Sequence, residues 1–259
     1  MDLQLKNRKA IVTGGSAGIG LAIVKALLAE GASVVVPGRS QAKLDQALPG
    51  NDAAVQKIVA DLATAEGAAA LIRAAPDTDI LINNLGIYEP KAFAEISDDD
   101  WLKIFEVNVL SGVRLSRQYL PGMRERNWGR VVFVSSESGL QIPAEMIHYG
   151  MTKTAQLAVA RGLAETLVGT GVTVNSVLPG PTASEGVGDF VASLAKARGV
   201  DAATVEKEFF ATARPSSLIR RFATPEEVAA MIVYTCSASA SATTGAALRV
   251  DGGVVRSIA

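Results

Sequence analysis

The chain has almost none of the residues from which metal sites and disulfides are built. Its 259 residues include one cysteine, Cys236, and one histidine, His148. A single cysteine excludes an intramolecular disulfide and any multi-cysteine metal site, and a single histidine excludes a zinc centre built on several imidazoles. We therefore expect no metal site. Cys236 lies among small residues, and we interpret it as a buried packing residue.

Strong net charge and long apolar runs are also missing. The formal net charge of −1 argues against nucleic-acid binding and against a polybasic membrane surface. No apolar run is long enough to span a bilayer, and the N-terminal residues carry charges where a signal peptide has its apolar core. The sequence therefore predicts a soluble, cytoplasmic protein.

What the chain does have is a regular alternation of short apolar runs with longer amphipathic stretches. The short runs are apolar throughout, which indicates burial on both faces and hence a parallel sheet. Seven runs are strand candidates: 10–13, 33–36, 55–60, 80–83, 130–135, 173–178 and 247–250. The stretches between them are helix candidates: 19–30, 41–48, 65–75, 99–126, 149–170 and 225–237. This alternation predicts an α/β fold, a single doubly wound domain over residues 1–259 with a seven-stranded parallel sheet.

Residues 182–222 break the alternation and are too long for an ordinary connection. They contain helical patterns at 187–198 and 202–212. Their apolar residues indicate a helical lid that covers a substrate site. The same residues favour an apolar or mixed substrate rather than a polyol. The residues concerned are Phe190, Val191, Leu194, Phe209 and Phe210.

Tyr149 and Lys153 are four residues apart in a predicted helix, so the phenol and the ammonium share one face. A free tyrosine titrates near pH ~10, and a nearby cation favours the phenolate and lowers that pKa. Such a pair suits reversible proton transfer to a carbonyl or alcohol oxygen. The spacing alone is common by chance. It gains weight from Ser136, which ends an apolar strand upstream, and from a glycine-rich turn near the N-terminus.

The glycine-rich turn reads T-G-G-S-A-G-I-G over residues 13–20, between the first strand and the first helix. Glycines let the backbone turn sharply and approach a pyrophosphate, which then meets free N–H groups at the helix N-terminus. The turn predicts a dinucleotide site formed by Gly14, Ser16, Ala17, Gly18, Ile19 and Gly20.

The second strand lacks the terminal carboxylate that holds the ribose hydroxyls of NAD. Arg39 and Ser40 stand there instead and can meet a 2′-phosphate, so NADP(H) is favoured and NAD(H) remains an alternative. Asp61, with Leu62 beside it, is placed to contact the adenine or to cap the next helix. Asn84 and Gly86 follow the fourth strand at the sheet edge where ligands of such folds bind.

Together these motifs resemble the short-chain dehydrogenase/reductase family, of the type called classical, over essentially the whole chain. The resemblance implies a Rossmann-type sheet, assembly into tetramers or dimers, and an NAD(P)(H)-dependent oxidoreductase that interconverts a ketone and a secondary alcohol. It rests on the T-G-x-x-x-G-x-G turn, N-N-x-G at 83–86, Asn108, Ser136, Tyr149-x-x-x-Lys153, Pro179-Gly180 and Asp251-Gly252-Gly253.

The resemblance also implies roles for single residues. Tyr149 is expected to be the acid/base and Ser136 to hydrogen-bond the reacting oxygen. Lys153 is expected to lower the pKa of Tyr149 and to bind the nicotinamide ribose, and Asn108 to hold a water that links Lys153 to solvent. Residues expected to line the nicotinamide side are Pro179, Gly180 and Thr182. Two departures from the family pattern, Leu85 for alanine and Ser184 for threonine, remove no catalytic group.

Several residues beside these motifs are pocket candidates, although each is also explained as an ordinary loop residue. They are Tyr88, Glu137, Gln141, Ile142, Glu145 and Met146. His148 precedes Tyr149 by one residue and points about 100° away around the helix, so we interpret it as a packing or cleft-wall residue.

Two other functions remain open at this point. A 3-oxoacyl-[acyl-carrier-protein] reductase needs a basic surface for its acidic carrier, and Arg124, Arg126 and Arg130 are candidates, diluted by Glu125. The carbonyl of a sugar, a steroid or a small aromatic is equally compatible. A non-catalytic dinucleotide-binding regulator is disfavoured, because such proteins generally lose the serine, tyrosine or lysine that this chain retains.

Overall fold

Seven short runs rich in β-branched residues form one parallel sheet in the computed structural model, which describes residues 2–258 apart from the side chains of residues 185, 189 and 190. The strand order is β3-β2-β1-β4-β5-β6-β7. The strands are β1 (Lys9–Val12), β2 (Ser33–Gly38), β3 (Val55–Val59), β4 (Ile80–Asn83), β5 (Gly129–Val134), β6 (Val172–Pro179) and β7 (Ala247–Val250). The predicted seven-stranded parallel sheet is confirmed, and every predicted strand is present.

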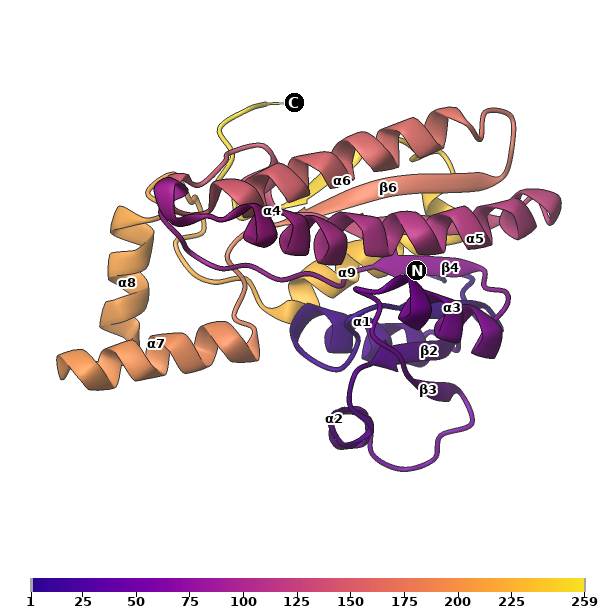
Figure 1. The fold of residues 1–259 in the computed structure, drawn as a ribbon, viewed down its shortest axis with the longest axis horizontal. Helices are drawn as coiled ribbons and strands as arrows, with labels where there is room; N and C mark the ends of the chain where they lie inside the picture. The colour runs from indigo at the N-terminus through magenta and orange to yellow at the C-terminus, as the bar shows by residue number, and fades with distance from the viewer. Residues whose placement is uncertain (1, 259) are drawn as a thin grey trace.

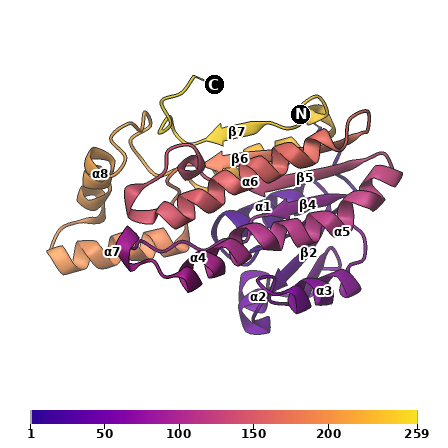
Figure 2. The ribbon, with the colours of Figure 1, turned by 45° about the horizontal axis from the view of Figure 1, so that its top comes forward.

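Helices cover both faces of the sheet and make two separate cores (Figures 1 and 2). On one face α1 and α9 pack on the strands through residues such as Ile23 and Ile232. On the other face α3, α5 and α6 do so through residues such as Leu71 and Leu115. The covering helices are α1 (Gly18–Ala29), α2 (Gln41–Ala47), α3 (Ala65–Ala74), α4 (Asp98–Phe105), α5 (Ser111–Glu125), α6 (Ile147–Glu165) and α9 (Pro225–Cys236). Within residues 2–258, no helix is both long and apolar enough to cross a membrane.

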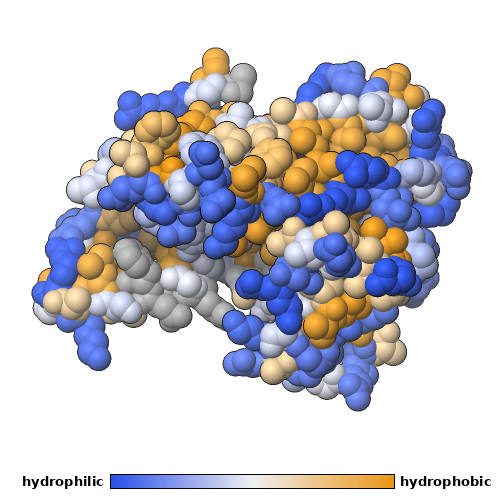
Figure 3. All heavy atoms as spheres, in the orientation of Figure 1, coloured by the Kyte–Doolittle hydropathy of each residue, from blue (hydrophilic) through white to orange (hydrophobic). Residues whose placement is uncertain are grey.

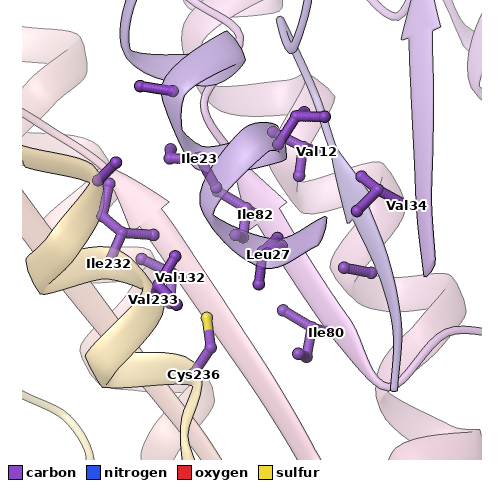
Figure 4. Close-up of a cluster of buried hydrophobic side chains, with 14 of the residues drawn as sticks. Val12, Ile23, Leu27, Val34, Ile80, Ile82, Val132, Ile232, Val233 and Cys236 are labelled. Atoms are coloured by element: carbon purple, nitrogen blue, oxygen red, sulfur yellow. The ribbon is translucent and has the colours of Figure 1, made fainter. Parts of the chain in front are cut away.

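Cys236 belongs to the core between α1 and α9, where its sulfur lies among Ile80, Val132 and Val233 (Figure 4). The side chain is fully buried, and this burial raises the pKa of the Cys236 thiol to about 12. A thiol with so high a pKa is not nucleophilic at neutral pH. Cys236 is therefore a packing residue, as the sequence predicts.

The strand order of the sheet reverses between β1 and β4. After β1 the chain moves outward through β2 and β3, and then it returns to the other side of β1 to form β4. In open α/β sheets the crevice beyond the carboxyl ends of the strands at this reversal binds ligands. The site is expected between the segments that follow Val12 and Asn83.

The predicted helix over 99–126 is divided by a π turn, Glu106–Leu110, between α4 and α5. Such turns arise where one extra residue is accommodated in a helix, and they are frequent at functional sites. The turn contains Asn108, whose side chain is buried. The apolar periodicity of the sequence gives no sign of the interruption, because the helix axis continues through it.

The segment 182–222 leaves the body of the molecule as two helices, α7 (Glu185–Arg198) and α8 (Ala202–Thr212), seen in orange in Figure 1. Its two ends meet at a bridge between Thr182 and Ala223. The helices are joined by an ion pair between Arg198 and Glu208. The two helices predicted in this segment are therefore present, with α7 beginning two residues earlier than expected, and their role as a lid stays a prediction.

Candidate active site

A cleft of about 440 Å³ lies beyond the carboxyl ends of β1, β4, β5 and β6. Most of the residues predicted for the dinucleotide and the chemistry line it. They are Gly14, Ala17, Gly18, Ile19, Gly20, Asn84, Gly86, Ser136, Tyr149, Lys153, Pro179, Gly180 and Thr182. Leu85 and Ser184, the two departures from the family pattern, line it as well.

The glycine-rich turn is shaped to receive a phosphate group. Gly14 has a φ of +65°, which favours glycine, and a Cβ on Gly20 would lie 2.1 Å from the carbonyl oxygen of Gly14. Helix α1 begins at Gly18, and its N-cap residue, Ala17, makes no side-chain capping bond. The N–H groups of the first turn have no intrahelical partner and remain available to an anion. The turn therefore fits the pyrophosphate of a dinucleotide.

Thr13 joins this turn to the end of β4. Its hydroxyl donates to the carbonyl of Ile82 at 3.2 Å and accepts from the N–H groups of Asn84 and Leu85, both at 2.9 Å. The Asn84 amide donates in return to the carbonyl oxygen of Thr13 at 3.0 Å. Thr13 thus fixes the two segments that form one end of the cleft, a role that the sequence analysis missed although the residue opens the glycine motif.

Ser136 follows β5 and meets Tyr149, which lies near the start of α6. The Ser136 hydroxyl donates to Glu137 Oε2 at 2.5 Å and accepts from the backbone N–H of Ser138 at 3.1 Å. Burial raises the pKa of Tyr149 above its ordinary value, and a hydrogen bond with Ser136 opposes that shift. Ser136 and Tyr149 thus line the same cleft.

Lys153 is buried behind the tyrosine. Its ammonium donates to the carbonyl of Val134 at 2.9 Å and to Gln156 Oε1 at 3.2 Å, and it lies 5.6 Å from the centroid of the Tyr149 ring. Burial lowers the pKa of Lys153 to about 8. The lysine was expected to lower the pKa of the tyrosine. Desolvation of the phenol is instead the largest cause of the shift and raises that pKa, and the cation that opposes it is Arg214.

Asn108 is held by the loop after β4 and by α6. Its side chain accepts from the N–H of Ile87 at 2.8 Å and donates to Thr152 Oγ1 at 3.0 Å. Its own carbonyl accepts from Gln156 Nε2 at 2.6 Å. Gln156 therefore links Lys153 to the backbone of Asn108. The water that Asn108 is expected to hold between Lys153 and solvent stays a prediction. The sequence analysis missed Gln156, although its place three residues after Lys153 on one helix face was a usable signal.

The residues predicted around the adenosine lie outside the cleft lining. Arg39 is exposed at the end of β2, and among the described residues its side chain makes no hydrogen bond or ion pair. Ser40 is the N-cap of α2, accepting from the N–H of Lys43 at 3.4 Å. Asp61 accepts from the N–H of Ala63 at 3.1 Å and so stabilises a turn. Leu62 is buried and Ser16 is half-buried, and the dinucleotide contacts of all five stay predictions.

Glu137 and an arginine from the lid form an unexpected polar group beside Ser136. Arg214 Nε donates to Glu137 Oε1 at 3.1 Å, and Arg214 Nη1 lies 3.6 Å from Glu145 Oε1. The side chains of Glu137 and Arg214 are only 7% and 13% exposed. Arg214 is 77 residues from Glu137 in the chain, so no local pattern predicts the pair.

Of the other pocket candidates, Tyr88 lines the cleft and packs edge-on against the Tyr149 ring, with centroids 6.2 Å apart. Gln141, Ile142 and Glu145 are exposed and Met146 is half-buried, all outside the cleft lining. His148 is buried and packs edge-on against the Trp101 ring at 5.8 Å, which agrees with its interpretation as a packing residue.

Two expectations about the substrate lose part of their basis. Arg130 is buried and donates to the carbonyls of Ser237, Gly129 and Gly171, so it cannot form part of a basic surface for an acyl carrier protein. The rings of Phe209 and Phe210 contact each other and Phe222 and do not line the cleft, so they do not support an apolar substrate. The side chain of Phe190 lies outside the described residues.

Among the residues that the structure describes, no cluster of acidic, cysteine and histidine side chains could hold a metal ion.

Known proteins share both the sequence and the fold. The family model described as short chain dehydrogenase matches residues 8–194. An uncharacterized oxidoreductase, YvrD, from Bacillus subtilis is 47% identical, with 100% of both chains covered. D-beta-hydroxybutyrate dehydrogenase from Cupriavidus necator is 33% identical over 97% of this chain and 99% of that protein.

A solved structure of L-sorbose reductase from Gluconobacter frateurii, complexed with NADPH and L-sorbose, superposes with a TM-score of 0.91 at 31% identity and covers 100% of both chains. The family match, the relatives and the cleft agree, and the chain belongs to the short-chain dehydrogenase/reductase family of oxidoreductases, which interconvert ketones and alcohols with a nicotinamide dinucleotide.

Proposed function

We propose that this oxidoreductase uses NADP(H) and that Tyr149 is the acid/base of the reaction. The observation that carries the proposal is that Ser136, Tyr149 and Lys153 line the same cleft as the glycine-rich turn. A nicotinamide dinucleotide bound there supplies or accepts the hydride. The chain's own residues then have to move one proton and stabilise one developing charge.

In the reducing direction the Tyr149 hydroxyl donates its proton to the carbonyl oxygen of the substrate. Ser136 hydrogen-bonds the same oxygen and stabilises the negative charge that develops on it. Lys153, 5.6 Å from the tyrosine ring, favours the phenolate that remains after the transfer. In the oxidising direction the phenolate accepts the proton of the alcohol, and the same contacts operate in reverse.

The preference for NADP(H) is supported by the end of β2. Arg39 is exposed there, and its guanidinium is free to meet a 2′-phosphate with two parallel hydrogen bonds. The structural relative complexed with NADPH is compatible with the same preference. NAD(H) is the alternative if Arg39 does not reach the phosphate.

A homo-oligomer, as a tetramer or a dimer in the cytoplasm, is part of the proposal. It is supported by hydrophobic residues that show on the face formed by α5 and α6 (Figure 3).

The test is a change of Tyr149 to Phe combined with assays over a panel of ketones. We expect the parent to oxidise NADPH with at least one ketone and Tyr149→Phe to lose nearly all turnover. Binding of NADPH, followed by its fluorescence, should be retained, because the ring and its packing remain. Turnover by Tyr149→Phe near the parent rate would reject Tyr149 as the acid, and a parent that binds NADPH but reduces no ketone would favour a non-catalytic regulator.

A further inference from the structure

We propose that Glu137 determines substrate specificity, by selecting ketones that carry a hydroxyl on the carbon next to the reacting carbonyl. The inference rests on the proposed function, because it assumes that Ser136 and Tyr149 both hydrogen-bond the reacting oxygen. It concerns the group that stands behind Ser136 in the wall of the cleft.

The argument begins with the single hydrogen of the serine hydroxyl. In this structure Ser136 donates that hydrogen to Glu137 Oε2 at 2.5 Å. The alternative, a protonated Glu137 that donates to Ser136, is disfavoured by Arg214, whose Nε lies 3.1 Å from the other carboxyl oxygen. A carboxylate paired with a guanidinium is an acceptor only.

The hydrogen that Ser136 needs for the substrate is therefore already committed. When the hydroxyl turns toward a carbonyl oxygen, Glu137 Oε2 loses its donor. The side chain of Glu137 is 7% exposed, so little solvent can replace that donor. A buried charged acceptor without a donor carries a large energetic penalty, and a substrate that leaves it so is bound poorly in the transition state.

A hydroxyl on the neighbouring carbon of the substrate removes this penalty. Glu137 Oε2 is one hydrogen bond away from Ser136 Oγ, which itself lines the cleft. A substrate whose carbonyl oxygen is held by Ser136 and Tyr149 brings its adjacent hydroxyl to the same side of the cleft. That hydroxyl can donate to Glu137 while Ser136 donates to the carbonyl, so every donor and acceptor is satisfied.

Charge further restricts the class of substrate. Arg214 is the cation shared by Glu137 and Glu145, so this polar group carries two carboxylates and one guanidinium. The excess of negative charge disfavours a substrate whose carboxylate lies beside the carbonyl. The geometry therefore favours neutral hydroxy ketones over both simple ketones and 2-oxo acids.

The experiment compares matched substrates with the full-length enzyme and NADPH. One pair is 3-hydroxy-2-butanone and 2-butanone, a second is 1-hydroxy-2-butanone and 2-butanone, and pyruvate is the anionic probe. We expect kcat/KM of the parent to be at least about tenfold higher for each hydroxy ketone than for 2-butanone, with pyruvate no better than 2-butanone.

Glu137→Gln is the diagnostic variant, because it keeps the shape of the side chain and removes the anionic acceptor. We expect its ratio of kcat/KM between hydroxy ketone and ketone to fall to about threefold or less. Glu145→Gln is the matched control, since it removes the other carboxylate on Arg214 without touching Ser136, and it should keep the parent's ratio. NADPH binding and the melting temperature verify that each variant is folded.

Equal kcat/KM of the parent for the two members of each pair would overturn this inference and leave the proposed function standing, and this decides the matter even if Glu137→Gln does not fold. A preference that persists unchanged in a folded Glu137→Gln would also overturn it. Failure of the parent to reduce any ketone while it binds NADPH would instead count against the proposed function itself.

Discussion

The ammonium of Lys153 donates a hydrogen bond to the amide oxygen of Gln156, at 3.2 Å, and the amide nitrogen of Gln156 donates to the carbonyl of Asn108 at 2.6 Å. The glutamine thus holds the lysine with one end and the π turn with the other. Lys153 has one further acceptor, the carbonyl of Val134. Two neutral acceptors stabilise the buried ammonium only partly, which agrees with the lowering of its pKa by burial to about 8.

Replacing Gln156 should move the pKa of Lys153 and, with it, the pH dependence of catalysis. In Gln156→Glu a carboxylate lies beside the ammonium and favours its charged form. We therefore expect the limb of the kcat/KM pH profile that reports the titration of Lys153 to shift upward by about one pH unit. Gln156→Leu removes an acceptor and should shift it downward. The measurement is kcat/KM between pH 6 and pH 10. The exposed Gln141→Glu is the control, and a profile that stays fixed in both Gln156 variants would show that Lys153 does not set that limb.

Arg39 should decide which dinucleotide is used. In Arg39→Asp the cation is replaced by a carboxylate that repels a 2′-phosphate and can accept from ribose hydroxyls. We expect the ratio of kcat/KM for NADPH over NADH to fall by at least about tenfold. Arg73→Asp makes the same charge change on the exposed side of α3 and should leave the ratio alone. An Arg39→Asp enzyme with an unaltered ratio would remove the basis for NADP(H).

Gly20 should not tolerate a methyl group. A Cβ at this position meets the Gly14 carbonyl oxygen at 2.1 Å and the Asn84 amide nitrogen at 2.6 Å, so the turn has to move. We expect Gly20→Ala to lose roughly 1–3 kcal/mol of stability and at least tenfold in dinucleotide affinity. Gly162→Ala is the control, because nothing lies within 4 Å of its added Cβ on α6, and it should be neutral or stabilising. Equal effects of the two changes would contradict the model of a closely packed phosphate turn.

Lys153 should lower the stability of the fold at neutral pH. Burial lowers its pKa to about 8 in the folded state, below its ordinary value of 10.5. The penalty on the charged form is therefore fully present below pH 8 and disappears as the pH rises toward the unfolded pKa. Lys153→Met removes this titration. The free energy of unfolding of the variant minus that of the parent should therefore fall by about 2 kcal/mol between pH 7 and pH 10.

Urea unfolding of parent and Lys153→Met at both pH values measures that change. The exposed Lys25→Met serves as control for the loss of a surface ammonium. A difference between parent and Lys153→Met that is the same at pH 7 and pH 10 would mean that Lys153 does not titrate as its burial implies.

The sequence predicted the sheet because each buried strand is an apolar run between helical stretches, a pattern that depends only on neighbouring residues. It also predicted that Ser136, Tyr149, Lys153 and the glycine turn share one site, since strands of a parallel sheet end at one edge. The sheet required only the local pattern, whereas the roles of the residues in the site came from the resemblance to the short-chain dehydrogenase/reductase family.

The features that the sequence did not reveal depend on contacts between distant segments. The pairing of Glu137 with Arg214 forms only when the segment after α8 returns to the cleft. The π turn at Asn108 leaves the apolar pattern on both sides intact, so periodicity does not detect it. The sequence shows that residues 182–222 contain several aromatic side chains, and this suggested an apolar wall of the substrate site. It does not show that Phe209 packs against Phe210 and Phe222.

The packing of α9 on α1 has a consequence for how the protein is made. Helix α1, which follows the glycine-rich turn, packs beside α9 on the same face of the sheet, and the two share one core through Ile23, Leu27, Ile232 and Val233 (Figure 4). During synthesis, residues 18–29 leave the ribosome long before residues 225–236, so this apolar face of α1 stays uncovered for most of translation. The nascent chain therefore exposes an apolar surface that chaperones can bind until α9 has been synthesised.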